Sequence, residues 1–241
     1  CNGRMLGNFG NAEVFSFHPT KFFNTSEGGA IATNDDALAK KIRLMKNFGF
    51  SGRHDEVIYI GTNGKMSEFS ALTGLTNLES LERFIAVNHE HYETYQEELR
   101  NIPGIRMISY DDRERCNYQY LVLEIDEAVT GIGRDHLVEL LRAENILARR
   151  YFYPGCHRME PYRSYFPHAG LVLPETERLT ARVLSLPTGT GVTDEDIRQI
   201  CNIIRLAVSP TYVAHTRGQV KGRPEMALPL QQPAGLPVLC R

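Results

Sequence analysis

The sequence lacks the features that mark membrane proteins, secreted proteins and nucleic-acid-binding proteins. No apolar run is long enough to cross a bilayer, and no hydrophobic stretch follows the first residues as a signal peptide would require. The formal net charge is only −2, which favours neither nucleic acid nor an anionic membrane as a partner. We therefore expect a cytoplasmic protein that binds no nucleic acid and no membrane.

Cysteine is scarce and carries no recognisable pattern. The chain has five, an odd number, and they are widely spaced: Cys1, Cys116, Cys156, Cys201 and Cys240. No pair has the spacing of metal ligands, and a disulfide framework is not indicated. Cys156 stands beside His157, but adjacent side chains of an extended chain point opposite ways, so the pair is no evidence of a catalytic dyad. We expect no metal site and a reducing compartment.

What is present is an ordinary globular composition with one unusual segment. Hydrophobic residues make up 42% and charged residues 23% of the 241 positions, enough for one large or two small domains. An apolar run from residue 12 to Phe17 predicts a buried strand, which His18 and Pro19 end. Lys21 follows this strand, ahead of a glycine pair that opens another. A lysine placed there can reach into a cleft and form a Schiff base with an aldehyde cofactor, although an exposed loop lysine is the alternative.

The first half of the chain alternates between strands and helices. Asn34 or Asp35 caps a predicted helix over residues 36–47, and a glycine-rich loop over 50–65 is long enough to indicate a binding or interface loop. Ser67 caps a helix predicted to run to about Leu99, with leucines in a helical stripe.

The second half begins after Pro103 and Gly104. We predict strands over 105–110, 118–125 and 183–186, helices over 134–144, 175–182 and 194–208, and an aromatic loop over 151–162. This pattern favours a small α+β domain with an antiparallel sheet. Residues 209–241 contain five prolines and no periodic apolar face, and we expect them to be disordered.

Several motifs together resemble the DegT/StrS-type sugar aminotransferases, and the resemblance covers about residues 1–207. They follow one another in a single order: SFHPTK at 16–21, EGG at 27–29, NDD at 34–36, NFG at 47–49, GTNGKMSE at 61–68, YPGCH at 153–157 and LP at 186–187. Several spaced motifs in one order are far more specific than any one of them alone.

The resemblance implies an α/β protein, the C-terminal portion of a fold-type I transferase that depends on pyridoxal phosphate. Residues 1–100 would be the end of the large, mainly parallel-sheet domain with the long linking helix, 101–208 the small α+β domain, and 209–241 the disordered tail. In the family the lysine segment lies near the middle. We therefore expect the chain to be part of a longer enzyme and inactive alone, with the ring-nitrogen acid, the ring-stacking aromatic and the phosphate-binding helix upstream.

The resemblance also assigns roles in cofactor binding. Lys21 would hold pyridoxal 5′-phosphate and move the proton, and the hydroxyl of Ser16 would bind its phosphate. Asn63 would reach the phosphate of the neighbouring subunit, which implies a homodimer with shared active sites. Local alternatives remain: Ser16 can tie down its own turn, and Asn63 with Gly64 can simply form a turn.

The resemblance also indicates which residues contact the substrate, but it leaves alternatives open. In similar enzymes the aromatic loop with Tyr153 and His157 lies over the sugar nucleotide, whereas ordinary packing is the alternative. A diphosphate needs cations, and the sequence does not choose among Lys65, Arg149, Arg150 and Arg158.

The implied function is transfer of an amino group from a donor such as L-glutamate to a nucleotide-linked keto-deoxy sugar, with dTDP-4-keto-6-deoxyglucose as the best candidate. Such amino sugars serve cell-surface polysaccharides or natural products. Some related dehydratases carry histidine in place of the lysine, so Lys21 favours transamination. The alternatives are a truncated, non-catalytic remnant that keeps dimerisation and small-domain surfaces, and a sugar dehydratase relative.

Overall fold

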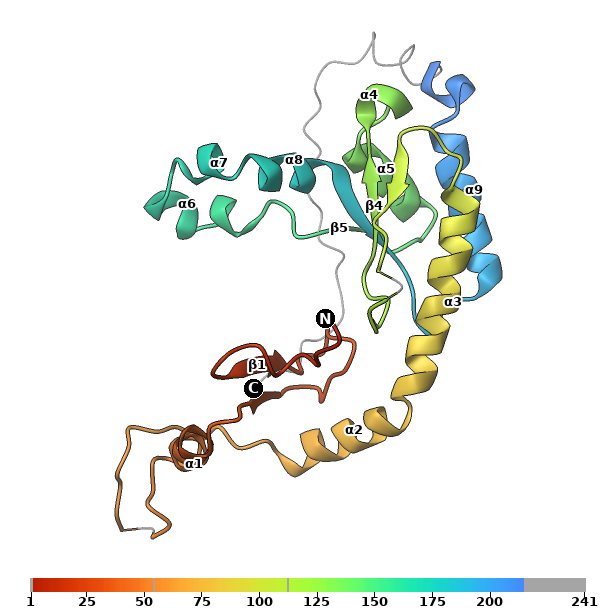
Figure 1. The fold of residues 1–241 in the computed structure, drawn as a ribbon. Coiled ribbons are helices and arrows are strands. Elements are labelled where there is room, and N and C mark those ends of the chain that lie inside the picture. Colours follow the sequence, from red (N-terminus) through yellow and green to blue (C-terminus); the bar gives the residue numbers. More distant parts are fainter. Residues whose placement is uncertain (1, 54, 112, 215–241) are drawn as a thin grey trace, which may run out of the picture.

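A computed structural model describes residues 2–53, 55–111 and 113–214 and shows two groups of elements joined by one long helix (Figure 1). The joining helix is α3, Leu81–Leu99. Before it come β1 (Glu13–Ser16), β2 (Gly29–Ala32), α1 (Asp36–Met45) and α2 (Glu68–Glu79). After it come β3 (Ile105–Met107), β4 (Leu121–Ile125), α4 (Glu127–Thr130), α5 (Arg134–Ala143), β5 (Arg149–Arg150), η1 (Cys156–Arg158), α6 (Tyr162–Tyr165), α7 (Ala169–Val172), α8 (Pro174–Arg182), β6 (Val183–Leu186) and α9 (Asp194–Ala207).

The first group contains a two-stranded sheet rather than a buried parallel one. Strands β1 and β2 pair antiparallel, with Glu13 opposite Ala32 and Ser16 opposite Gly29. The prediction of a buried strand is wrong here: strands that pair edge to edge leave the faces of their sheet uncovered, and Val14 is 78% exposed. Among the described residues of this group, this antiparallel pair is the only sheet.

The helices of the first group begin at the residues that the sequence indicates. The side chain of Asp35 accepts a hydrogen bond from the Leu38 amide at 3.0 Å and caps α1, and Ser67 caps α2 by accepting from the Ser70 amide at 3.1 Å. Each cap satisfies an amide that has no partner within its own helix.

The predicted single helix from Ser67 to Leu99 is two helices, separated at Ser80. Leucines at every third position rotate around a helix of 3.6 residues per turn, so they do not define one continuous face. Leu72, Leu75 and Leu78 of α2 are more than half exposed, whereas α3 buries a different set of side chains, which includes Tyr95 and Leu99.

The second group is built on a four-stranded sheet in the order β3-β4-β6-β5. All three pairings are antiparallel, as the sequence predicts, and Leu123 of β4 lies opposite Leu184 of β6. Strand β6 spans the predicted residues, whereas β3 and β4 are shorter than predicted.

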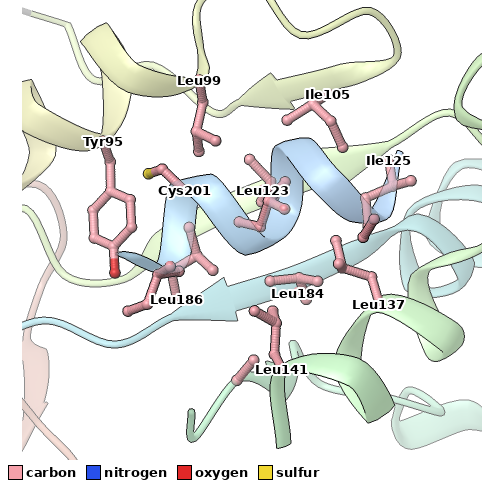
Figure 2. Close-up of a cluster of buried hydrophobic side chains, with 14 of the residues drawn as sticks. Tyr95, Leu99, Ile105, Leu123, Ile125, Leu137, Leu141, Leu184, Leu186 and Cys201 are labelled. Carbon is pink, nitrogen blue, oxygen red and sulfur yellow. The ribbon is translucent and has the colours of Figure 1, made fainter. Parts of the chain in front are cut away.

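Among the residues that the structure describes, the hydrophobic core lies entirely in this second group and its joining helix. Figure 2 shows side chains from α3, the sheet, α5 and α9 gathered into one cluster. Tyr95, Leu123, Leu137 and Leu184 are each fully buried, and the Tyr95 hydroxyl donates to the Pro187 carbonyl at 3.1 Å. Helix α3 is therefore fixed to the sheet along its second half.

The last described residues continue this core. Thr193 and Asp196 form a reciprocal capping box at the start of α9. After α9, residues 210–214 form a further helical turn, in which Val213 packs into the core and the Tyr212 hydroxyl lies 3.3 Å from His136 Nε2. The expected start of a disordered tail at residue 209 is thus too early, because Val213 buries an apolar side chain; residues 215–241 lie outside the described residues.

The segment between β5 and β6 extends away from the sheet and carries η1, α6, α7 and α8 (Figure 1). We call residues 151–173 the aromatic segment. Its large exposed side chains include Phe152, Tyr165 and Phe166. No helix in the described part of the chain is long and apolar enough to span a membrane.

Candidate active site

Lys21 sits in a tight turn directly after β1. The Lys21 amide donates to the His18 carbonyl at 2.9 Å, and His18 Nδ1 lies 3.0 Å from the Thr20 hydroxyl. The Lys21 side chain is exposed, and its amine makes no hydrogen bond or ion pair with any described residue. The turn therefore presents an uncommitted primary amine.

Helix α2 holds the residues that follow this turn. The Asn77 side-chain amide donates to the Asn24 carbonyl at 2.8 Å, and Thr25 is buried beside Gly74. A Cβ at position 74 would lie 2.9 Å from the Thr25 methyl group, so the close approach requires glycine there.

The segment that leads into β4 holds the same turn from the other side. The Tyr120 hydroxyl donates to the Thr20 carbonyl at 3.0 Å, and the Gln119 side-chain amide approaches that oxygen at 3.4 Å. Side chains of the second group thus bond to the Thr20 carbonyl in the Lys21 turn and join the two groups of elements there.

A cavity of about 220 Å³ lies at this junction. Its walls are Lys21, Phe22, Phe84, Asn88, Gln119, Thr188, Gly189 and Thr190, among which there is no carboxylate. A primary amine in a cavity with hydroxyl, amide and aromatic walls has no competing counter-ion. It is therefore available to a carbonyl group.

A buried chain of hydrogen bonds fixes the polar wall of this cavity. The Thr188 hydroxyl donates to Asn88 Oδ1 at 3.0 Å, and Asn88 Nδ2 donates to the Asn117 carbonyl at 3.1 Å. His91 Nδ1 lies 3.1 Å from the Thr188 hydroxyl. Burial lowers the pKa of His91, although Asp194 and Glu90 oppose the shift, so the ring is held toward its neutral form. Local sequence pattern gives no indication of these contacts, since residues 88 and 188 are a hundred positions apart.

The other predicted cofactor residues lie outside this cavity. Ser16 is exposed at the end of β1, and its oxygen lies 3.4 Å from the His18 amide, a long contact. Asn63 pairs through its backbone with Asn47, and Lys65 Nζ donates to the Asn47 side chain at 2.9 Å. The structure thus brings Asn63 and Lys65 together, but neither lines the Lys21 cavity of its own chain. Their cofactor and substrate roles stay predictions.

His157 is committed to an ion-pair cluster in the aromatic segment. His157 Nε2 lies 2.7 Å from Glu177 Oε1, and Arg158 binds both oxygens of the same carboxylate. The hydrogen bonds from Arg158 and then from His157 lower the pKa of Glu177 to about 2. The His157 side chain is only 10% exposed, so its proposed contact with substrate would involve little of the ring.

Tyr153 is held by two cations. The guanidinium carbons of Arg134 and Arg150 lie 4.9 Å and 5.1 Å from the centre of its ring. Its side chain remains 45% exposed and does not line the Lys21 cavity.

Comparison with known proteins identifies the family. The model of the DegT/DnrJ/EryC1/StrS aminotransferase family matches residues 1–205. The chain belongs to this family. Both the predicted family and the predicted α/β fold of pyridoxal-phosphate-dependent transferases are confirmed, and aminotransferases of the DegT family depend on that cofactor.

Two curated members of the DegT family illustrate the likeness. A dTDP-4-amino-4,6-dideoxy-D-glucose transaminase of Shigella dysenteriae is 33% identical over 198 residues, which is 81% of this chain and 52% of that protein. An Escherichia coli protein of the same name is 34% identical over 180 residues, 74% of this chain and 47% of that protein. The chain thus spans about half the length of the curated relatives that it matches.

Solved structures in the DegT family share the fold. The structure of DesI, determined in the presence of its TDP-sugar product, is 47% identical with a TM-score of 0.81; the match covers 90% of this chain and 55% of DesI.

The residues present fit attachment of the family's cofactor. The amine of Lys21 is uncommitted, and the cavity lining contains no carboxylate that would pair with it. Ser16 and Thr20 add hydroxyl groups near the turn, which are suitable donors for a phosphate. The acid that would keep the ring nitrogen of pyridoxal phosphate protonated is not among the described residues that line this cavity.

Proposed function

We propose that this chain carries the cofactor lysine of a sugar-nucleotide aminotransferase that converts dTDP-4-keto-6-deoxyglucose into the 4-amino sugar, with an amino acid such as L-glutamate as donor. The observation that carries the proposal is the uncommitted amine of Lys21 at a polar cavity, in a family of aminotransferases. The names of the Shigella and E. coli relatives and the TDP-sugar product of DesI support the choice of sugar.

The chemistry divides between the cofactor and this chain. Bound pyridoxal phosphate supplies an electron sink for the carbon that exchanges the amino group. Lys21 would hold the cofactor through its aldehyde and, once displaced by the amine of the donor, would accept and return a proton at Nζ. Asn88, Thr188 and Thr190 present amide and hydroxyl groups to the same cavity, which suits a hydroxyl-rich substrate.

The remaining predicted residues complete the proposed site. Ser16 binds the cofactor phosphate of its own subunit, and Asn63 binds that of the partner in a homodimer. Tyr153, His157 and Lys65 contact the nucleotide sugar. The exposed position of Asn63, away from the Lys21 cavity, is compatible with a role across a subunit interface.

Replacement of the lysine tests the proposal. In the complete protein, Lys21→Ala should abolish amino transfer to dTDP-4-keto-6-deoxyglucose and remove the visible absorbance of the lysine-bound cofactor. Lys40→Ala, an exposed lysine on α1, is the matched control and should change neither readout. Normal turnover of Lys21→Ala would end the assignment.

The same assay separates the alternatives. A non-catalytic remnant would show no visible cofactor band that borohydride bleaches, and a dehydratase would consume sugar without dependence on an amino donor. NMR of the product distinguishes amination at C4 from amination at C3.

Shared active sites are tested by mixing subunits. Lys21→Ala and Asn63→Ala subunits of the complete protein are each expected to be inactive, and their mixture should regain some activity because a mixed dimer contains one site with both native residues. No recovery after confirmed subunit exchange would exclude the role of Asn63 across the interface.

We also propose a cytoplasmic site of action and a product destined for a cell-surface polysaccharide or a natural product. The chain is 30% identical over 214 residues to the spore coat polysaccharide biosynthesis protein SpsC of Bacillus subtilis, which supports the first destination.

A further inference from the structure

We propose that Tyr120 is a positioning residue that fixes the peptide unit of Lys21 and couples it to the aromatic segment. This inference rests on the proposed function, because the turn that it fixes carries the cofactor lysine. Tyr120 does not line the Lys21 cavity, so it acts on the lysine through the backbone and has no part in the chemistry itself.

The hydrogen bonds around Lys21 hold one peptide unit at both ends. The carbonyl of Thr20 and the amide of Lys21 belong to the same planar group. The carbonyl accepts from the Tyr120 hydroxyl at 3.0 Å, and the amide donates to the His18 carbonyl at 2.9 Å. With both ends bonded, rotation of this peptide plane is restrained, and so is the direction in which the Lys21 side chain leaves the backbone.

Tyr120 is itself held in place by its neighbours in the second group. Its own carbonyl accepts from the Tyr110 hydroxyl at 2.8 Å. The Tyr110 ring packs edge-on against Tyr92 of α3, with ring centres 5.4 Å apart. The hydroxyl that reaches the Lys21 turn therefore belongs to a residue whose backbone is bonded to a tyrosine that packs against the core helix α3.

The Tyr120 ring also contacts the beginning of the aromatic segment. Its centre lies 5.4 Å from that of Tyr151, which in turn lies 4.5 Å from Phe152. One side chain thus contacts the Lys21 turn through its hydroxyl and the aromatic segment through its ring. A displacement of the aromatic segment, as on substrate entry, would be transmitted to the peptide unit of Lys21.

Removal of one hydroxyl tests the restraint without any use of the cofactor. Tyr120→Phe keeps the ring and its contact with Tyr151. In the cofactor-free complete protein, we expect amide hydrogen exchange of residues 20–22 to become about three- to tenfold faster, as loss of one hydrogen bond predicts. Tyr212→Phe is the matched control, because it removes a hydroxyl that lies 3.3 Å from His136 in another part of the fold. It should leave exchange at residues 20–22 unchanged.

A second variant tests the coupling. Tyr151→Leu leaves the Tyr120 hydroxyl in place but removes the ring that contacts Tyr120, and it should accelerate exchange at residues 20–22 by a smaller factor than Tyr120→Phe. If neither variant changes exchange there, the proposal is wrong. If only Tyr120→Phe does, the restraint stands and the coupling is excluded.

The functional consequence is measured separately in the loaded enzyme. Tyr120→Phe should lower kcat several-fold with little change in KM and shift the pH at which the visible cofactor absorbance changes, whereas a merely structural role would lower the melting temperature and move neither. Unchanged kcat and an unchanged absorbance titration would overturn the functional part. Because hydrogen exchange needs no cofactor, failure of the aminotransferase assignment would leave that readout intact, and the two failures are distinguishable.

Discussion

The two groups of elements differ in where their apolar side chains lie. Every buried hydrophobic side chain among the described residues falls between Tyr92 and Val213, in α3 and the group that follows it. The first group instead exposes large apolar side chains on β1, β2 and α2, such as Val14, Ile31 and Leu72. The second group therefore encloses its own core, whereas the first depends on surfaces beyond its two strands for stability.

This contrast explains why the candidate site lies between the two groups. The Lys21 turn belongs to the group without a core of its own. Tyr120 donates to its Thr20 carbonyl, and Asn77 donates to the carbonyl of Asn24, just after the turn. Precise placement of a catalytic group requires rigid support. Here the group with the core provides one side of that support, which no local motif in the sequence indicates.

The largest expected effect comes from truncation of a core side chain. Leu184 on β6 is fully buried, so Leu184→Ala should lower the free energy of unfolding by about 2–5 kcal/mol in urea titrations. Val14→Ala on β1 is the control from the exposed group and should change it by less than about 0.5 kcal/mol. A comparable loss at both positions would contradict the contrast between the groups.

A smaller effect is expected from the buried carboxylate of Glu124. Burial raises its pKa and is the largest influence, but hydrogen bonds from Arg106 and Arg178 together outweigh it, and the net pKa is lowered from 4.5. A lowered folded pKa means that this stabilisation is present above pH 4.5 and is lost as the pH falls through the folded value.

Glu124→Gln should accordingly lower the free energy of unfolding at pH 7 by about 1.5–3 kcal/mol, as loss of charged hydrogen bonds predicts. The variant should also lose less stability than the native chain between pH 4.5 and the folded pKa. Glu175→Gln, which leaves the Glu124 ion pairs in place, is the control on α8. Equal acid sensitivity of the native chain and Glu124→Gln would refute this role.

Truncation at two points tests the extent of the core. Chains that end at Val208 and at Ala214 differ only by the last described turn, which carries Val213. We expect the shorter chain to be less stable by about 1–2 kcal/mol, because it loses a buried valine. Equal melting temperatures would instead show that the turn at residues 210–214 contributes nothing to the stability of the core.

The smallest effect is expected from the helix caps. Thr193→Ala removes the capping box of α9, which packs in the core, and should cost about 1 kcal/mol in global unfolding. Ser67→Ala removes the cap of α2 in the exposed group and should affect global unfolding less, while it increases local exchange of the α2 amides. The reverse order would place α2 within the cooperative core.

The sequence predicts those elements whose signals are local. The caps at Asp35 and Ser67, the start of α9 at Asp194 and strand β6 are where the pattern places them. The helix break at Ser80 has no such signal, because leucines at every third position resemble one continuous stripe although each is rotated around the helix relative to the last. The helical turn at residues 210–214 has no such signal either, because one buried valine leaves no periodic pattern.

The residues of the candidate site also divide into those with a local sequence signal and those without one. The sequence predicts the role of Lys21, because its motif is contiguous in the chain. The sequence does not predict the roles of Gln119, Tyr120, Asn88 and Thr188, because each bonds to a partner far away in the chain. Tyr120, for example, is a hundred residues from Thr20. Such contacts are set by tertiary packing and have no local signature.

The contact between Gly74 and Thr25 has a consequence for how this sequence can diverge. Glycine within a helix is unfavourable by about 1 kcal/mol relative to alanine, so drift at position 74 would ordinarily favour alanine. The Thr25 methyl group, 2.9 Å from where that alanine would place its Cβ, blocks this exchange. Serine at position 25 lacks that methyl group but keeps the hydroxyl that donates to the Glu27 carbonyl. Substitutions at the two positions should therefore be coupled, with alanine at 74 tolerated better when residue 25 lacks the methyl group, as serine does.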